Sequence, residues 1–234
     1  MTIYSLQKAA REARARLIEE HGLTDYELGN ALATIDTISV LLDRHLTVTE
    51  REAGHRLVAL SNWMQRSAQA VISAQHSRAH RSGRWWCQAV ALSEAIGMAA
   101  AQPDQLVWVV MTDVQWQAGD SWAAMQLATA WELQNLNILT VVTGLHNGHS
   151  VKKTVPVEPL RTKLAAFGLA VYEADSTHYR TLIDGLHAVS HDQRPSCLLI
   201  SGVYGSGLAA LEEAGAALLV DDRAKQLHEL MSRP

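Results

Sequence analysis

The stretch Leu106-Val-Trp-Val-Val-Met-Thr112, followed by Asp-Val-Gln-Trp-Gln-Ala-Gly119, decides the fold of this 234-residue chain. Its first seven residues form a continuous run of β-prone side chains, which is typical of a strand buried on both faces in a parallel sheet. A polar segment that ends in glycine follows directly. Ligands of open parallel sheets bind beyond the carboxyl ends of the strands, so residues 112–119 are the first candidate for a site.

Strand-like and helix-like segments alternate downstream of this stretch. Helices are expected at 121–134, 160–167 and 179–190, and strands at 137–142, 169–173 and 196–201. The alternation predicts an α/β fold, a doubly wound, mostly parallel sheet with helices on both faces. The carboxyl-terminal edge of that sheet would bring together four segments, namely 112–119, 143–150, 175–178 and 201–207.

The first hundred residues are predicted to be mainly helical. Apolar residues recur with a helical period in 5–20, 26–44 and 89–101. Thr47-Val-Thr-Glu50 has the pattern of a capping box and predicts a further helix that runs towards Gln75. We expect a single domain over 1–234, divided into a mainly helical part (1–101), a βα core (102–208) and a helical tail (209–234).

Composition excludes several classes of protein. With 48% hydrophobic and 19% charged residues the chain is not disordered, and its net charge of −4 offers no basic field for nucleic acid or an anionic membrane. Cys87 and Cys197 match neither a disulfide framework nor a metal-ligand cluster. No apolar run approaches the roughly 20 residues that span a bilayer. We therefore expect a cytoplasmic protein.

Several motifs resemble the thiamine-diphosphate motif of the transketolases. The strand end at Thr112-Asp-Val-Gln-Trp-Gln-Ala-Gly119 is followed by Trp122-Ala-Ala, by Leu133-Gln-Asn-Leu136 and by Gly144-Leu-His146, in the family's order. Flanking segments agree as well, among them Ala91-Leu-Ser-Glu-Ala-Ile-Gly-Met-Ala99. The resemblance extends roughly from Gly29 to Leu208 and implies the thiamine-diphosphate-binding fold of the family's N-terminal domain.

The resemblance also implies a partner. Single-chain transketolases carry a diphosphate-binding domain, a pyrimidine-binding domain and a C-terminal domain, and this chain looks like the first alone. It would then be one subunit of a split, hetero-oligomeric transferase that moves ketol or acyl groups between carbon atoms. A pyrimidine-domain and C-terminal chain would be the partner, and thiamine diphosphate with Mg²⁺ would be the cofactors.

The family's site residues carry over to few positions. Asp113 matches the metal-binding Asp, and Thr143 stands where the second ligand is normally Asn. The resemblance assigns cofactor binding to Asp113, Val114, Thr143 and His146, and metal binding to Asp113 and Thr143. The catalytic residues stay unknown, with His146 and His149 as candidates.

Other cofactor positions depart from the family pattern. Gly-Asp-Gly has become Thr112-Asp113-Val114, which puts a β-branched side chain where backbone would approach phosphate. The family's Gly-His-Pro-Gly is Tyr26-Glu-Leu-Gly29, and its Ser-Lys-Gly-His falls near Ser61-Asn-Trp-Met64. These changes predict a degenerate cofactor motif, a pseudoenzyme subunit that binds the cofactor weakly or not at all on its own.

Alternative interpretations stay open. The chain could be an active, divergent thiamine-diphosphate-dependent transferase subunit that uses Asp113, or a repurposed module for a phosphorylated ligand. Asp113 could equally be a hydrogen-bonded loop acid, and the glycines of 202–207 could be structural. Seven Trp residues against one Phe suggest a further feature. Trp63, Trp86 and Trp116 fall at or beside cofactor positions, which suggests a filled or reshaped cofactor cleft rather than ordinary core composition.

Overall fold

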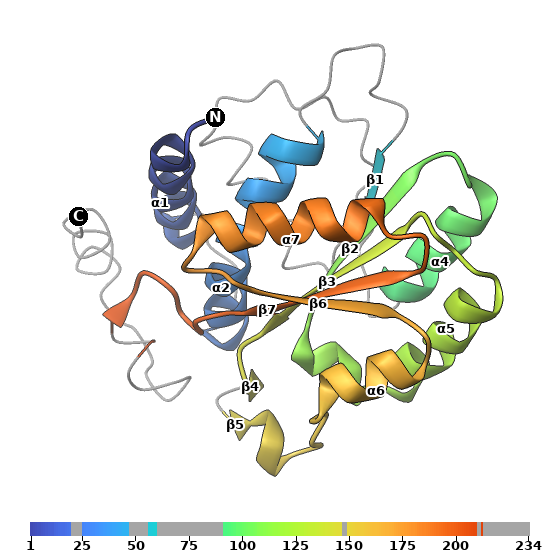
Figure 1. The fold of residues 1–234 in the computed structure, drawn as a ribbon. Helices are drawn as coiled ribbons and strands as arrows, with labels where there is room; N and C mark the ends of the chain where they lie inside the picture. Colours follow the sequence, from blue (N-terminus) through green and yellow to red (C-terminus); the bar gives the residue numbers. More distant parts are fainter. Residues whose placement is uncertain (20–24, 47–55, 60–90, 147–148, 210–211, 213–234) are drawn as a thin grey trace.

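A five-stranded parallel sheet forms the centre of the molecule (Figure 1). The computed structural model describes residues 1–19, 25–46, 56–59, 91–146, 149–209 and 212. Its strands are β1 (Arg56–Ala59), β2 (Leu106–Thr112), β3 (Leu136–Val142), β6 (Ala170–Asp175) and β7 (Ser196–Ser201). They are arranged in the order β1-β2-β3-β7-β6, and every neighbouring pair is parallel.

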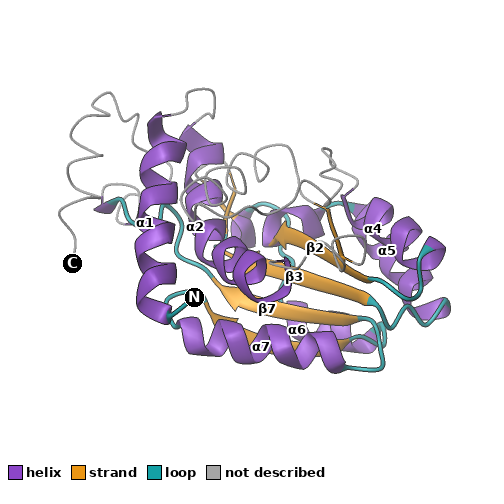
Figure 2. Ribbon diagram, turned by 90° about the horizontal axis from the view of Figure 1, so that it is seen from above, coloured by secondary structure: helices purple, strands orange, loops and turns teal. Residues whose placement is uncertain are grey.

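Helices cover both faces of the sheet (Figure 2). The helices α4 (Ala91–Ala101), α5 (Gly119–Ala130) and α6 (Leu160–Ala166) contribute to one hydrophobic cluster. The helices α1 (Ile3–Glu19), α2 (Asp25–Leu41) and α7 (Tyr179–His191) contribute to the other, and a π-helical turn (Leu42–Leu46) extends α2. The predicted doubly wound α/β fold is therefore confirmed.

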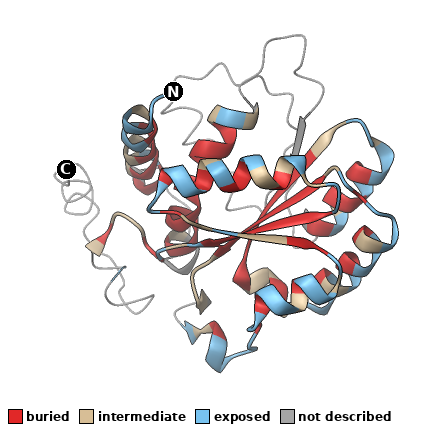
Figure 3. Ribbon diagram, in the orientation of Figure 1, coloured by how far each residue is buried: buried red, intermediate tan, exposed pale blue. Residues whose placement is uncertain are grey.

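Strand β2 explains why its sequence is apolar throughout. Val107, Val109 and Met111 belong to the cluster under α4 and α5, whereas Trp108 and Val110 belong to the cluster under α2 and α7. All five are buried (Figure 3). A strand covered by helices on both faces has no solvent side, so it shows no polar alternation.

The order of the strands places a topological switch between β3 and β7. The chain leaves β3 through α6 and reaches the edge strand β6, and it returns through α7 on the opposite face to insert β7 between them. The segments that follow β3 and β7 therefore leave towards opposite faces of the sheet. Such a point is where open α/β sheets bind ligands.

Most of the predicted elements are confirmed, and the helix expected after Thr47 is wrong in part. Residues 56–59 form the strand β1, which pairs with β2 in parallel and runs from Arg56 beside Leu106 to Ala59 beside Val109. Pairing with a neighbouring strand outweighs the local helical pattern in so short a segment. The rest of the predicted helix and nearly all of the C-terminal tail lie outside the described residues, and the division into three parts stays a prediction.

The loop expected between Thr143 and Val157 carries local structure. It holds a two-stranded antiparallel hairpin of β4 (Leu145–His146) and β5 (His149–Ser150), followed by a 3₁₀ turn at Val151–Lys153. No helix within the described residues is long and apolar enough to cross a membrane.

Candidate functional site

Asp113 lies at the carboxyl end of β2 and is closed to solvent. It begins a 3₁₀ turn (Asp113–Gln117), which is held in place by a hydrogen bond from the N–H of Thr112 to Oε1 of Gln115 (2.8 Å). Its residue exposure is 1%. The N–H of Gly144 donates to its Oδ2 at 2.8 Å, and the N–H of Thr143 donates to its Oδ1 at 3.3 Å. The carboxylate therefore connects the end of β2 to the segment after β3.

Burial raises the pKa of the Asp113 carboxyl above its usual value. The backbone N–H bonds from Gly144 and Thr143 lower the pKa and offset only part of that effect. Among the described residues, no Lys, Arg or His forms an ion pair with Asp113. A buried carboxylate without a cationic partner is an electrostatically costly group.

Thr143 gathers oxygen atoms from three parts of the chain. Its hydroxyl Oγ1 lies 3.0 Å from Oδ1 of Asn30 on α2, 3.5 Å from Oδ1 of Asp113 and 3.4 Å from the carbonyl of Leu145. One hydroxyl proton cannot satisfy three acceptors at once. Oxygen atoms of these types are the ligands that Mg²⁺ prefers, so they are the donors available to a cation at this position.

The structure therefore brings Asp113 and Thr143 together, as the sequence predicts, and adds Asn30. Sequence reasoning missed Asn30, although it directly follows Gly29 in a segment matched to a cofactor motif. No pattern of spacing joins Asn30 to Thr143, because their contact depends on how α2 packs across the sheet.

The switch point between β3 and β7 is tightly packed. The N–H of Gly202 donates to the carbonyl of Val142 at 3.0 Å, and a Cβ atom on Gly202 would lie 2.5 Å from Cγ1 of Val141. The N–H of Gly205 donates to the carbonyl of Gly29 at 2.9 Å, and the buried ring of Tyr204 lies against Gly29. The loop after β7 is thus fastened to α2, and the glycines of this loop have a structural role.

Trp116 is a core residue beneath α5. It is fully buried, and its indole N–H donates to Oγ1 of Thr140 at 3.0 Å. The indole N–H of Trp122 donates to the carbonyl of Trp116 at 2.8 Å, and the two rings are 5.2 Å apart. Val114 packs against the same hydrophobic cluster. Trp116 and the buried Trp108 are thus ordinary core aromatics, which corrects the interpretation of Trp116; Trp63 and Trp86 lie outside the described residues.

The two candidate histidines lie on the small hairpin. His146 of β4 pairs in register with His149 of β5, and the side chain of His149 is exposed. No hydrogen bond or ion pair within the described residues joins His149 to Asp113. The described residues also contain no group of three or more His, Cys, Asp or Glu side chains that could hold a metal ion.

Comparisons with known proteins agree on the fold. No family model matches the chain. The structure superposes on transketolase from Campylobacter jejuni with a TM-score of 0.72 and 17% identity, over 92% of this chain and 40% of that one. A transketolase variant from Pichia stipitis gives a TM-score of 0.76 and 14% identity, over 97% of this chain and 40% of that one. The fold is that of the transketolases.

A curated relative is similar to this transketolase-like chain in sequence as well. That relative is one of the subunits of apulose-4-phosphate transketolase from Actinobacillus succinogenes, and it is 25% identical over 123 residues, which are 53% of this chain and 45% of that protein. The chain therefore spans less than half the length of the relative and of the solved transketolases that it matches.

The described residues do not fit thiamine diphosphate with its cation in this arrangement. The Asp113 carboxylate is closed to solvent and engaged at both oxygens. Val114 turns an apolar side chain to the core where the transketolases use glycine. The neighbouring crevice is occupied by Tyr204 and by the contact of Gly202 with Val141. No reaction step at these residues follows from the geometry.

Proposed function

We propose that this chain is the diphosphate-domain subunit of a split, transketolase-like complex that transfers ketol or acyl groups, and that its own cofactor motif is degenerate. One observation carries the proposal. Within a transketolase fold, the carboxylate expected to hold the metal is buried and bonded at both oxygens by the amides of Thr143 and Gly144. Asp113 therefore joins two loops, which is a structural role that persists without cofactor.

A partner chain would complete the complex. The relative from Actinobacillus succinogenes is by name one component of a transketolase with several, and the match covers less than half of its length. Apolar side chains are exposed in the loops that follow β3 and β7, at Val155 and Val203. These loops lie at the carboxyl-terminal edge of the sheet, where a pyrimidine-binding chain would approach. Burial of such side chains is a common contribution to a stable interface.

Co-purification tests the proposal. A tagged copy of the chain, expressed with the neighbouring genes of its own genome, is expected to retain a pyrimidine-domain chain in fixed stoichiometry through size-exclusion chromatography. Val203→Asp should weaken this retention, because it places a charge in the proposed interface. Leu127→Asp is the matched control, since Leu127 is similarly exposed on α5, near the opposite edge of the sheet. A stable monomer without a partner would contradict the proposal.

A further inference from the structure

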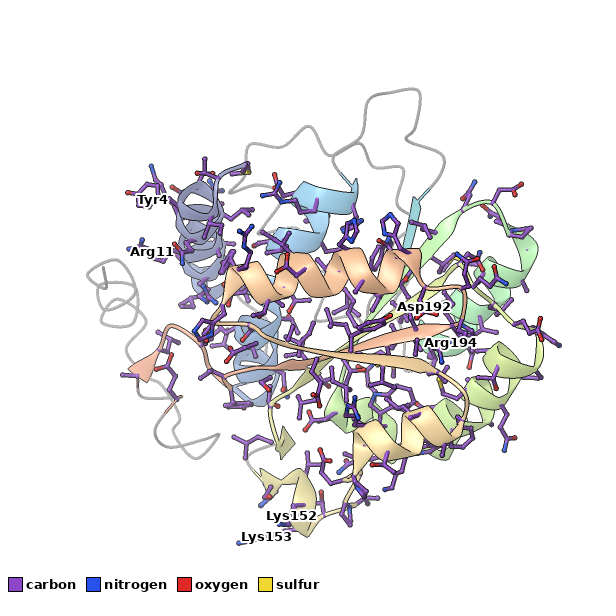
Figure 4. All side chains as sticks on the ribbon, in the orientation of Figure 1. Tyr4, Arg11, Lys152, Lys153, Asp192 and Arg194 are labelled. Atoms are coloured by element: carbon purple, nitrogen blue, oxygen red, sulfur yellow. The ribbon has the colours of Figure 1, made fainter. Side chains whose placement is uncertain are left out.

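A second cavity lies beside α1, away from Asp113. It has a volume of about 440 Å³ and lies between α1, the start of α7 and the loops after β6 and β7. Tyr4 and Arg11 project from the same side of α1 (Figure 4), and Arg14 follows one turn later. Three hydroxyl side chains, Ser176, Thr177 and Ser206, line the cavity from the loops. Neither Asp113 nor Thr143 contributes to it.

Arg14 is held in place by a buried polar network. The residue is only 7% exposed, and its guanidinium forms an ion pair with Asp36 and donates from Nη2 to Oγ of Ser206 at 3.1 Å. The hydroxyl of Tyr179 donates to the other carboxylate oxygen of Asp36 at 2.6 Å. The Nε–H of Arg14 has no hydrogen-bond partner among the residues that the structure describes. A buried, positively charged donor without an acceptor is costly unless a ligand completes it.

The cavity carries an excess of positive charge. Arg11 and Arg14 contribute two cations, and Asp36 contributes one carboxylate. Ser206 accepts the N–H of Arg14, so its own proton remains available to a ligand. The N-terminus of α7, a helix of 13 residues, begins at Tyr179 in the cavity wall and adds the positive end of its dipole. The N–H of Gly207, also in the wall, already donates to Oε1 of Glu212 at 2.7 Å.

We propose that this cavity binds the phosphate group of a small phosphorylated metabolite. Guanidinium groups on one side and hydroxyl groups on the other suit a tetrahedral oxyanion, which accepts hydrogen bonds from several directions. The volume exceeds that of phosphate alone and leaves room for a short organic chain. The site needs only this chain, so it does not depend on the presence of a partner or on the state of the cofactor motif.

Titration with inorganic phosphate and with glycerol 3-phosphate tests the site, with glycerol as the uncharged control. Calorimetry should show binding of both phosphates and none of glycerol. In amide NMR spectra, the shifts should centre on Ser176, Thr177 and Ser206, and those of Thr143 and Gly144 should stay unchanged. Shifts centred on Thr143 and Gly144, or no binding of either phosphate, would overturn the proposal.

Two charge reversals on α1 separate a site from general attraction. Arg11→Glu should weaken the binding of glycerol 3-phosphate about ten-fold or more, because it replaces a cation of the cavity with an anion. Arg16→Glu makes the same change on an exposed residue of the same helix that does not line the cavity, and should leave affinity within about two-fold. Arg11 is only partly buried, so its replacement should not prevent folding. Equal losses in the two variants would show a non-specific charge effect and would contradict the site.

Discussion

The N–H of Gly144 donates to Oδ2 of Asp113 at 2.8 Å, across the carboxyl ends of two neighbouring strands. This bond, together with the one from Thr143, converts the acidic residue of a cofactor motif into a connection between β2 and the segment after β3. Each buried N–H would lose its acceptor if the carboxylate were removed. The role of Asp113 can therefore be tested by stability as well as by ligand binding.

Asp113→Ala should destabilise the folded chain by about 1–3 kcal/mol, because it leaves two backbone N–H groups without their acceptor. Urea unfolding measures this loss. Asp104→Ala is the control, since Asp104 is exposed and its loss should change stability by less than about 0.5 kcal/mol. An unchanged or raised stability of Asp113→Ala would show that the carboxylate has no structural role.

The stability contributed by Asp113 should also depend on pH. The pKa of this carboxyl is raised by burial, so the folded chain binds the proton more tightly than the unfolded chain. Its contribution is therefore fully present below the unfolded pKa of about 3.9 and is lost as pH rises through the raised folded pKa. The free energy lost in Asp113→Ala should be larger near pH 4 than near pH 7, roughly the range over which urea unfolding would compare the two proteins. A difference that grows with pH would contradict the burial effect.

Gly29→Ala should destabilise the chain strongly, by about 2 kcal/mol or more, because overpacking against a buried ring forces the backbone to shift. A Cβ atom there would lie 2.0 Å from Cζ of Tyr204. Gly97→Ala on α4 is the control, because nothing lies within 4 Å of the added atom. That change should stabilise the chain by about 0.5–1 kcal/mol through helix propensity. Similar melting temperatures for the two variants would show that Tyr204 does not close on α2.

Trp116→Phe should cost about 1–3 kcal/mol, because it removes the indole donor from the buried hydroxyl of Thr140. Trp131→Phe is the control, since this indole is 54% exposed. Thermal unfolding compares the two variants. If Trp116 were instead an aromatic lining a ligand cleft, its replacement would leave stability nearly unchanged, and that result would contradict its place in the core.

Local patterns predict the central part of this fold and fail at its margins. The strand over Leu106–Thr112 is found as predicted, because burial on both faces leaves an unbroken apolar run. The strand β1 is four residues long at one edge of the sheet, and only its pairing with β2 distinguishes it from the helix expected there. Short segments are decided by tertiary contacts, which sequence periodicity does not record.

The candidate site is likewise predictable only in part. Asp113 and Thr143 each follow a parallel strand, so their proximity can be inferred from the fold. The contributions of Asn30 and Tyr204 cannot, because both depend on the position of α2 and of the loop after β7 relative to the sheet. The aromatic residue at Trp116 stands in a cofactor-like motif, yet its side chain serves the core.

Calorimetric titration of thiamine diphosphate with MgCl₂ tests the central claim most directly. The titration uses the isolated chain and the chain with its co-purified partner, each as the natural protein and as Asp113→Asn, which preserves the size of the side chain. We predict no metal-dependent binding to the isolated chain, and any binding to the complex should be the same in the Asp113→Asn variant. Tight, magnesium-dependent binding that Asp113→Asn abolishes would contradict the degenerate cofactor motif and would show an active cofactor site in this chain.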